Sequence, residues 1–505
     1  MKSTLLLSAS LLAYSAEAIV LNERAVPAVV SFDVQRSVIE DPVRRLHQEQ
    51  SRQKRDKTLS FDIVNPNDLT LYWVNGTVGT PGQPVTLALD TGSSDTWVNV
   101  ASSAFCSQKS KPCKPFGTYD HSKSSTYKFL DHNFDNTYGG GSQTNQIKGD
   151  YITETVKFGG ATLKNFQIGV ASSISANDKG LLGVSYAALG GGSQDMYNNF
   201  PIALVDAGYI KSPAFSLYLN ELHASKGQLL FGGVDTSKYT GELQSVPTIA
   251  VNGVHYSLEI ALTGLSLKKD GKKASSYSSS ELPLVTSLDC GSTLIILPET
   301  LTNDVFDDLD VKYNSTLNVG ILPCSMKNND WNLTYSFSGA DIDVPMSQLV
   351  LDPVGYEGDE VQCIFGIVPG PSDMVLMGDP FLRSVYAVFD LGNNEISLAQ
   401  ANYNPGKEHI LEIGTGKDAV PGATKVKSAV TSGVNSAAAS ATSVVGPVET
   451  EGPVATVTSG SSAGSTSSSS SAATSTSKSS AALLTNDSMH LVAGIAGAIG
   501  LAMAL

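Results

Sequence analysis

The chain has 505 residues, of which 41% are hydrophobic, and this is ample for a large core of two or three domains. The formal net charge of -15 at pH 7 argues against nucleic acid as a partner. The same acidic balance fits a protein that works in acid, where some carboxylates are neutral.

The first 18 residues have the pattern of a secretory signal peptide. Lys2 precedes the apolar run TLLLSASLLAY, and small residues at Ala16 and Ala18 mark the expected cleavage site. Residues 19–55 form a basic segment that ends in RQKR, a cleavage site for a dibasic processing protease. We interpret it as a pro-segment, with a solvated basic linker as the alternative. Charge would hold it partly on an acidic body, and acidification should weaken that attraction.

Residues from about 69 to 401 show mostly strand patterns. Alternating or apolar runs such as LTLYWVNGTVG, QPVTLALD and VYAVFDLGNNEISLA are separated by Gly, Asn, Asp and Pro. Helical patterns are few and short, at 195–207 and 298–309. We predict an all-β body that is too large for one ordinary sandwich.

A weak internal repeat in this body suggests two related lobes. LALDTGSSDTWV at 87–98 resembles TSLDCGSTLIIL at 286–297. Leu-Leu-Gly at 181–183 follows the first copy, and Leu-Met-Gly at 376–378 follows the second at a similar distance. Two halves with the same order of motifs predict a duplicated β lobe with a cleft between the copies.

The repeat places one aspartate in each half, Asp90 and Asp289. A carboxylate buried alone is costly, but a glycine two residues later permits a tight turn that brings backbone N–H groups to it. If the two turns meet, both carboxylates cannot ionise readily, so one pKa falls and the other rises. One member is then a base for water and the other an acid for a carbonyl.

DTGSSDTWV and DCGST resemble the two active-site motifs of pepsin-like aspartic proteases, and the resemblance covers about residues 69–401. It implies an all-β, bilobal pepsin-like fold with a cleft between pseudo-symmetric lobes, at 56–240 and 241–406. Asp90 and Asp289 would be the catalytic dyad, which shares one proton as is established for this family. The dyad would activate water without a covalent intermediate, a metal or another cofactor.

The resemblance also implies roles for the neighbours of the dyad. Gly92 and Gly291 would form the tight turns, and Ser93 and Ser292 would donate hydrogen bonds to the outer carboxylate oxygens. The Thr91 hydroxyl would bond the backbone of the opposite active-site loop.

NTYGGGSQTNQIKGDY resembles the flap hairpin of the family, with Tyr138 as the tyrosine that closes over substrate. An exposed hairpin aromatic is the alternative for Tyr138. The family more often has Tyr-Gly-Thr-Gly here, whereas Tyr138 and Gly139 are followed by two further glycines. This difference predicts a looser flap tip.

The chain has five cysteines, and an odd count in a secreted protein needs an explanation. The resemblance implies disulfides between Cys106 and Cys113 and between Cys324 and Cys363. Cys290 is left as a nucleophile, an intermolecular bridge or a buried thiol. We favour the buried thiol, at a position where the family usually has Thr or Ser. Because a thiol is a weaker donor than a hydroxyl, the contact between the active-site loops should be asymmetric.

The composition changes after the body. Ser, Thr, Ala, Gly and Val dominate residues 407–480, which predicts a disordered, O-glycosylated stalk. Residues 481–505 contain the tail MHLVAGIAGAIGLAMAL, which fits a GPI-attachment signal, with a tail-anchored helix as the alternative. The expected attachment residue is Ser479 or Ser480.

Together, these segments resemble the fungal yapsin branch and place the protein on the secretory route to the plasma membrane or cell wall. The expected partners are peptide or protein substrates, the outer membrane leaflet through the anchor, and cell-wall polysaccharide; we expect a monomer. Glycosylation sequons stand at Asn75, Asn314, Asn332 and Asn486, the last of which would leave with the tail signal.

The leading hypothesis is a cell-surface aspartic endopeptidase that is made as a zymogen and acts at acidic pH. A catalytically weak protease-like domain that binds peptides or serves in the wall is the alternative, and Cys290 favours it. Both aspartates and Tyr138 favour the enzyme. Cleavage at basic residues would use acidic groups such as Asp95 and Asp195, whereas broad hydrophobic specificity is the other possibility.

Overall fold

The computed structural model describes residues 27–36 and 72–435, with gaps at 141–142, 176, 188–196, 225, 251–252, 271, 273 and 278–279. The predicted signal peptide, most of the pro-segment, the GPI signal, Ser479, Ser480, Asn486 and Asp195 lie outside these ranges. No helix within the described ranges is long and apolar enough to cross a membrane.

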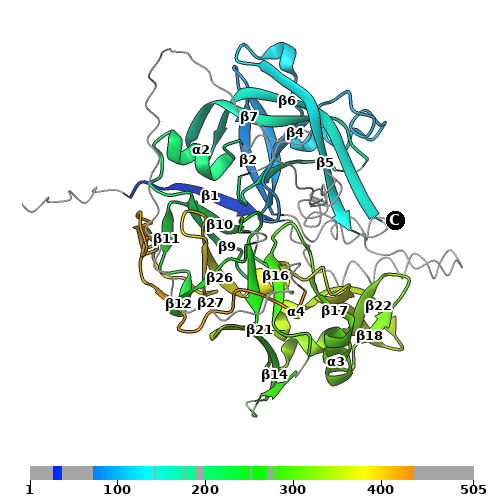
Figure 1. The fold of residues 1–505 in the computed structure, drawn as a ribbon. Coiled ribbons are helices and arrows are strands. Elements are labelled where there is room, and N and C mark those ends of the chain that lie inside the picture. The colour runs from blue at the N-terminus through cyan, green and yellow to red at the C-terminus, as the bar shows by residue number, and fades with distance from the viewer. Residues whose placement is uncertain are drawn as a thin grey trace, which may run out of the picture.

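The described chain is an all-β molecule with two lobes, as predicted (Figure 1). The N-terminal lobe contains β2 (Trp73–Val78), β3 (Gln83–Asp90), β4 (Thr96–Asn99), β5 (Lys128–Gly140), β6 (Gln143–Phe158), β7 (Ala161–Ser173) and β8 (Gly180–Gly183). The strands between the lobes are β1 (Val30–Gln35), β9 (Ala214–Tyr218), β10 (Lys226–Phe231), β11 (Gly233–Asp235), β12 (Tyr239–Pro247), β26 (Val385–Asp390), β27 (Glu395–Ala401), β28 (Ile410–Glu412) and β29 (Ala423–Lys425).

The C-terminal lobe is built from shorter strands and most of the helices. Its strands are β13 (Glu259–Leu262), β14 (Gly264–Lys269), β15 (Ser275–Ser276), β16 (Leu284–Leu288), β17 (Ile295–Pro298), β18 (Lys312–Asn314), β19 (Val319–Pro323), β20 (Trp331–Phe337), β21 (Ala340–Pro345), β22 (Val350–Glu357), β23 (Glu360–Phe365), β24 (Ile367–Gly370) and β25 (Leu376–Met377). The helices of the described chain are α2 (Phe200–Asp206), α3 (Glu299–Leu309), α4 (Met346–Leu349), α5 (Asp379–Leu382), and the 3₁₀ turns η2 (Lys114–Phe116), η3 (His121–Lys123) and η4 (Cys324–Asn328).

The two helical patterns in the sequence correspond to α2 and α3. Helix α2 starts later than the pattern, at Phe200, where Pro201 occupies the first turn. Helix α3 buries the apolar residues Leu301, Val305 and Leu309, which recur at helical spacing and so form one face.

One sheet of 14 strands connects the lobes. Its order is β29-β12-β27-β26-β9-β10-β1-β2-β3-β8-β4-β7-β6-β5. The largest cluster of buried apolar side chains also runs through both lobes and includes Phe32, Leu89, Leu288 and Phe389. The lobes therefore share a core, and the boundary predicted at residue 240 falls inside β12 rather than between two separate units.

Each half contains the same three-strand arrangement. Strand β8 pairs parallel with β3 and antiparallel with β4, and β25 pairs in the same way with β16 and β17. The central strands are the two Leu-x-Gly segments. A Cβ at Gly183 would lie 2.6 Å from the backbone of Ser94, and one at Gly378 would lie 2.2 Å from the Leu294 oxygen. Both positions need glycine because two backbone segments cross there.

Strand β1 lies within the predicted pro-segment and is part of the shared sheet. It pairs antiparallel with β10 over six residues, from Val30 opposite Phe231 to Gln35 opposite Lys226. Phe32 points into the core and touches the rings of Phe200 and Phe231 edge-on. The described part of this segment is thus a strand of the body and not a solvated linker.

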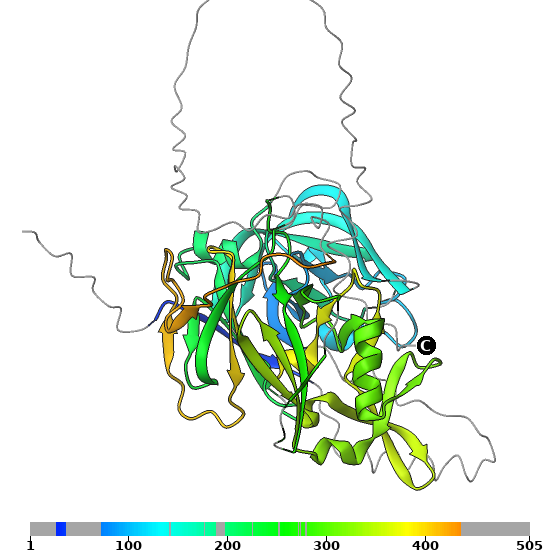
Figure 2. The ribbon, with the colours of Figure 1, turned by 60° about the horizontal axis from the view of Figure 1, so that its bottom comes forward.

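The body continues past the predicted start of the stalk at residue 407, and this corrects that boundary. Residues 406–435 (orange in Figure 2) return to the strands between the lobes, where β28 pairs with β11 and β29 pairs parallel with β12. Ile413 is fully buried. The side chain of Asn435 bonds both the N–H and the C=O of Val285, at 2.7 and 3.0 Å. The prediction of disorder failed here because the composition did not reveal these few apolar contacts.

Candidate active site

Asp90 and Asp289 stand at equivalent places in the two halves. Asp90 is the last residue of β3, opposite Gly183, and its C=O accepts from Val184 N at 3.0 Å. Asp289 directly follows β16, and its N–H donates to Met377 O at 3.1 Å. Both strands are apolar and have neighbours on each side, so the two carboxyl groups are carried to buried positions.

A tight turn holds each carboxyl group. Gly92 N donates to Asp90 Oδ1 at 2.8 Å, and the Ser93 hydroxyl donates to Asp90 Oδ2. In the second half, Gly291 N donates to Oδ1 of the aspartate at 2.8 Å, and Ser292 Oγ donates to its Oδ2 at 2.5 Å. These donors offset part of the cost of burying two carboxyl groups.

The two turns meet, so that the carboxyl groups of Asp90 and Asp289 hydrogen-bond each other. A Cβ at Gly291 would stand 2.8 Å from Asp90 Oδ1 and 3.1 Å from Asp289 Oδ1. Glycine at this position therefore leaves the space in which the two carboxyl groups approach each other.

The two carboxyl groups are electrostatically unequal. Burial raises the pKa of Asp90, while Ser93 and the Gly92 N–H oppose that rise. Burial also raises the pKa of Asp289, to well above its usual range, and the neighbouring charge of Asp90 raises it further. Because two neighbouring buried carboxyl groups cannot both ionise readily, the pair holds one proton between them over a range of acidic pH.

Thr91 and Cys290 join the two turns to each other. Thr91 Oγ1 donates to Leu288 O at 2.8 Å and accepts from Cys290 N at 2.9 Å. In the reverse direction, Cys290 Sγ donates to Leu89 O at 3.5 Å. The contact is asymmetric, with a hydroxyl on one side and a thiol on the other.

Cys290 is fully buried and free. Burial raises its pKa well above the usual range, and the charges of Asp289 and Asp90 add to the rise. It therefore remains a protonated thiol, and a nucleophile would need a thiolate. The other four cysteines form the two predicted pairs, Cys106–Cys113 and Cys324–Cys363.

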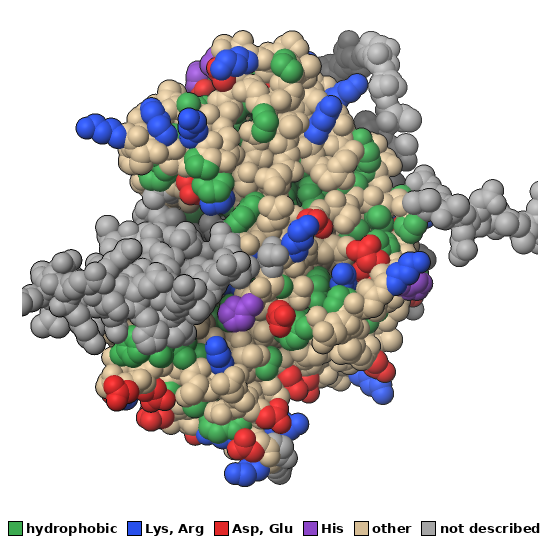
Figure 3. All heavy atoms as spheres, turned by 180° about the vertical axis from the view of Figure 1, so that it is seen from behind, with side chains coloured by type: hydrophobic (Ala, Val, Ile, Leu, Met, Phe, Trp, Pro, Cys, Tyr) green, Lys and Arg blue, Asp and Glu red, His purple; other side chains and the backbone are tan. Residues whose placement is uncertain are grey.

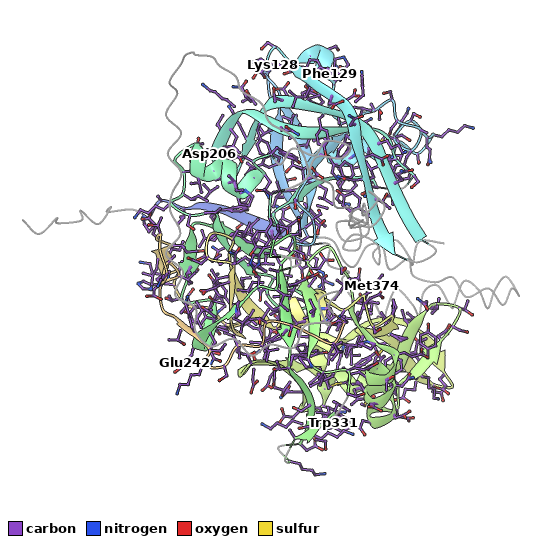
Figure 4. All side chains as sticks on the ribbon, viewed as in Figure 1. Lys128, Phe129, Asp206, Glu242, Trp331 and Met374 are labelled. Atoms are coloured by element: carbon purple, nitrogen blue, oxygen red, sulfur yellow. A yellow bond between two sulfur atoms is a disulfide. The ribbon has the colours of Figure 1, made fainter. Side chains whose placement is uncertain are left out.

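Strands β5 and β6 form the hairpin in which the flap was expected. The hairpin starts at the outer end of the N-terminal lobe, where Lys128 and Phe129 are labelled, and the arrow of β5 points toward the other lobe (Figure 4). Tyr138 on β5 is 3% exposed, and its hydroxyl accepts from Trp97 Nε1 at 3.0 Å. The alternative of an exposed hairpin aromatic is therefore excluded. Gly139 pairs with Thr144 near the end of the hairpin.

Some residues of this site were not found in the sequence. Trp97 is one, because its bond to Tyr138 joins strands that are three places apart in the sheet. Asp95 was expected among acidic groups that face the substrate, but its carboxylate is buried and accepts from Asn136, Tyr151 and Tyr197. The sequence near Asp95 gave one hint of this role, namely a charged residue directly ahead of an apolar strand.

The described residues contain no group of three or more His, Cys, Asp or Glu side chains that could hold a metal ion. The arrangement instead offers one ionised and one protonated carboxyl group side by side. Such a pair can take a proton from water and give one to a carbonyl oxygen. Among the three sequon asparagines in the described ranges, Asn75 is exposed, and Asn314 and Asn332 are half-buried.

Comparisons with known proteins agree with this geometry. A family model described as eukaryotic aspartyl protease matches residues 71–401. The chain is 45% identical over 452 residues to the "Probable aspartic-type endopeptidase opsB" of Aspergillus oryzae, over 88% of this chain and 91% of that protein. The protein of the same name in Aspergillus fumigatus is 44% identical, over 82% of this chain and 84% of its own length.

A more distant relative is the "Aspartic proteinase yapsin-3" of Saccharomyces cerevisiae. It is 33% identical over 384 residues, which are 72% of each chain. Relatives at these levels of identity and a family model that spans most of the chain support an aspartic-type hydrolase. The chain belongs to the eukaryotic aspartyl protease family.

Proposed function

We propose that this protein is a secreted, cell-surface aspartic endopeptidase, made as a zymogen and active at acidic pH. In the proposed reaction, ionised Asp90 takes a proton from water, which attacks the peptide carbonyl. Protonated Asp289 gives its proton to the carbonyl oxygen, which yields a tetrahedral gem-diol. The C–N bond then breaks as Asp90 gives its proton to the leaving nitrogen and Asp289 takes a proton back from one hydroxyl, so that a carboxylic acid and an amine are released and the dyad is restored. The observation that carries this proposal is the pair of buried carboxyl groups, each held by its own turn and brought together where the two turns meet.

The test is cleavage of a peptide library at about pH 4 to 5, with and without a transition-state peptide mimic. Asp90→Asn should abolish turnover while the thermal midpoint stays near that of the wild type, because the amide keeps the shape of the carboxyl group. If the wild type and this variant both fail to cleave any peptide, the proposal is wrong. The cleavage profile also separates preference for basic residues from broad hydrophobic specificity.

The zymogen part of the proposal is supported by strand β1. Arg36, at its end, is 7% exposed, and its guanidinium donates to Leu222 O. Leu222 N donates to Gln348 Oε1 at 2.9 Å, and the same oxygen accepts from Arg383 Nε at 3.0 Å. The pro-segment therefore places a cation in a buried, charged cluster of the body.

Two buried carboxyl groups face that cation. Burial raises the pKa of Asp379 to about 7, and the charges of Arg383 and Arg36 oppose the rise. Burial also raises the pKa of Asp352, again opposed by Arg36. Because bound Arg36 lowers both pKa values, the complex with the pro-segment binds fewer protons than the body without it. Acidification through about pH 7 should therefore weaken the hold on the pro-segment.

The cell-surface part rests on the sequence at the two ends and on the likeness to yapsin-3. We propose GPI attachment at Ser479 or Ser480, glycosylation at Asn75, Asn314 and Asn332, and a shortened stalk that starts after residue 435. We also propose that the protein is a monomer whose partners are the outer membrane leaflet, through the anchor, and cell-wall polysaccharide. Phosphatidylinositol-specific phospholipase should release the protein from cells. Retention after treatment, without a covalent link to the wall, would contradict the anchor.

A further inference from the structure

Asp95, a buried carboxylate outside the dyad, lies directly ahead of strand β4. It is 7% exposed, and both of its oxygens accept hydrogen bonds. Oδ2 accepts from Asn136 Nδ2 at 2.7 Å, and Oδ1 accepts from the Tyr197 hydroxyl and from the Tyr151 hydroxyl at 3.4 Å. These donors come from β5, from β6 and from the residues ahead of α2, so the carboxylate joins three separate segments.

Two of these segments are the strands of the flap hairpin. Asn136 stands two residues before Tyr138 on β5 and therefore on the same face of the strand. On β4, Trp97 stands two residues after Asp95 and donates to the Tyr138 hydroxyl at 3.0 Å. Asp95 and Trp97, which are two residues apart, thus hydrogen-bond to Asn136 and Tyr138, which are two residues apart on one face of β5.

The backbone of Asp95 is attached to the first dyad turn. Its C=O accepts from Gly183 N at 3.0 Å, and Gly183 is the register partner of Asp90. The pKa of Tyr138 is raised well above its usual range by burial, and the charges of Asp95 and Asp90 add to the rise. Asp95 therefore connects the hairpin that carries Tyr138 to the turn that carries Asp90.

The packing around Asp95 does not require a charged side chain. The rings around it belong to a small apolar cluster separate from the main core, with Tyr151 edge-on to Phe134 at 5.2 Å and to Tyr197 at 5.9 Å. A buried carboxylate costs stability unless it is fully hydrogen-bonded. An ionised carboxylate, however, accepts from all of these donors at once, and its charge-assisted hydrogen bonds are the stronger kind.

We propose that Asp95 is a positioning residue for substrate binding, whose carboxylate holds the β5–β6 hairpin against the start of β4 and so keeps Tyr138 in place beside the dyad. The role rests on the proposed function of Asp90 and Asp289. The titratable groups that face Asp95 are Tyr138, Tyr151 and Tyr197. Burial raises the pKa of Asp95, so its hold should weaken toward the acidic end of the working range, where KM should rise.

The experiment compares Asp95→Asn and Asn136→Ala with Asp135→Asn. Asp135 lies on the same strand, but it is only half-buried and pairs with Lys148 at 3.0 Å. We would measure kcat and KM for one peptide between pH 3 and 6, the Kd of a transition-state peptide mimic, and the thermal midpoint. Asp95→Asn should raise KM and the Kd of the mimic about tenfold, with kcat within about threefold of the wild type.

The other variants sharpen this test. Asn136→Ala should also raise KM. The double variant should have a KM no higher than that of Asp95→Asn, because the two residues share one contact. Asp135→Asn should behave like the wild type. The acidic rise in KM should be absent in Asp95→Asn, which has no carboxylate at this position to titrate.

Three results would overturn the role of Asp95. The first is that Asp95→Asn keeps the KM and the mimic affinity of the wild type at every pH. The second is that the rises in KM caused by Asp95→Asn and Asn136→Ala add up in the double variant. The third is that Asp95→Asn loses activity only to the extent that its thermal midpoint falls, while Asn136→Ala keeps the KM of the wild type. Failure of the proposed function looks different, because the wild type would then lack turnover. The mimic affinities would still test Asp95.

Discussion

At the scale of single residues, the dyad depends on small differences between two similar turns. Asp90 and Asp289 have the same kinds of donors, and burial raises the pKa of both carboxyl groups, with the charge of Asp90 adding to the rise at Asp289. The contact between the turns is also unequal, because Thr91 contributes a hydroxyl and Cys290 a thiol. Each difference leads to a substitution that tests it.

Cys290→Ser should retain or raise activity. A serine hydroxyl is a stronger donor than a thiol, and the pseudo-equivalent Thr91 hydroxyl makes this kind of bond at 2.8 Å. The free energy of unfolding should change by no more than about 1 kcal/mol. Urea unfolding and peptide cleavage measure the two effects, with Cys290→Ala as the control that removes the donor. Complete loss of activity in the serine variant would show that the thiol itself is used.

Gly291→Ala should lower kcat by at least about a hundredfold, because a methyl group 2.8 Å from Asp90 Oδ1 forces the carboxyl groups apart. Gly355→Ala is the matched control, since a Cβ there meets no atom within 4 Å. Active-site titration with a tight peptide mimic would count folded molecules. Equal kcat in both variants would show that the close approach of the carboxyl groups is not needed.

At the scale of elements, two segments that looked peripheral in the sequence are parts of the body. Strand β1 fills a place in the shared sheet between β10 and β2, and residues 406–435 pair with β11 and β12 between the lobes. Each is held by a few specific contacts rather than by a long apolar run. Their removal should therefore have measurable and separate consequences.

Arg36→Gln should let the pro-segment leave at higher pH, by about one unit, because the attraction to Asp379 is lost. The difference from the wild type should be largest at neutral pH and vanish in acid, where that carboxyl group is neutral. Gel analysis of pro-segment release across pH 4 to 8 measures it. Asp33→Asn is the control on the same strand. Its exposed pair with Lys226 contributes little. Identical release in all three proteins would contradict the role of Arg36.

A chain that ends at Gly406 should unfold at a thermal midpoint at least about 5 °C below that of a chain ending at Asn435. It loses the buried Ile413, two strand pairings and the hydrogen bonds between Asn435 and Val285. A chain that ends at residue 480 should match the one ending at Asn435. Equal midpoints for the two shorter chains would show that residues 407–435 do not stabilise the body.

At the scale of the whole molecule, the balance of buried and exposed acids sets the response to pH. On the face shown in Figure 3, charged side chains are spread among uncharged ones and are screened by water. The acids that matter most are buried, because desolvation raises their pKa values. They include the dyad, Asp95, Asp352 and Asp379.

The thermal midpoint should fall by at least about 4 °C as the pH rises from 5 to 8. The pKa of Asp379 is about 7 in the folded protein, against 3.8 for an aspartate that is exposed to water, as in the unfolded chain. The folded state therefore binds more protons between these values, and this contribution to stability is lost as the pH rises through about 7. Calorimetry across this range checks the slope, which Asp379→Asn should flatten. A midpoint that rises toward pH 8 would contradict the prediction.

Much of the site was predictable because it is local in the chain. Asp90 with Gly92 and Ser93, and Asp289 with Gly291 and Ser292, each form a turn within four consecutive residues. The repeated order of motifs then indicated two lobes. Trp97, Asp95 and Arg36 were missed or misassigned, since their partners are 41, 41 and 186 residues away in sequence.

The sequence by itself determined the family, the two aspartates, their turns and the β character of the body, because these follow from short motifs and from periodicity. Only the tertiary structure decided how the two carboxyl groups are brought together, what contacts the β5–β6 hairpin makes and where the body ends. Burial and the approach of distant segments control those properties. A pKa depends on the surroundings of a side chain, and in this chain the decisive neighbours come from different strands and different lobes.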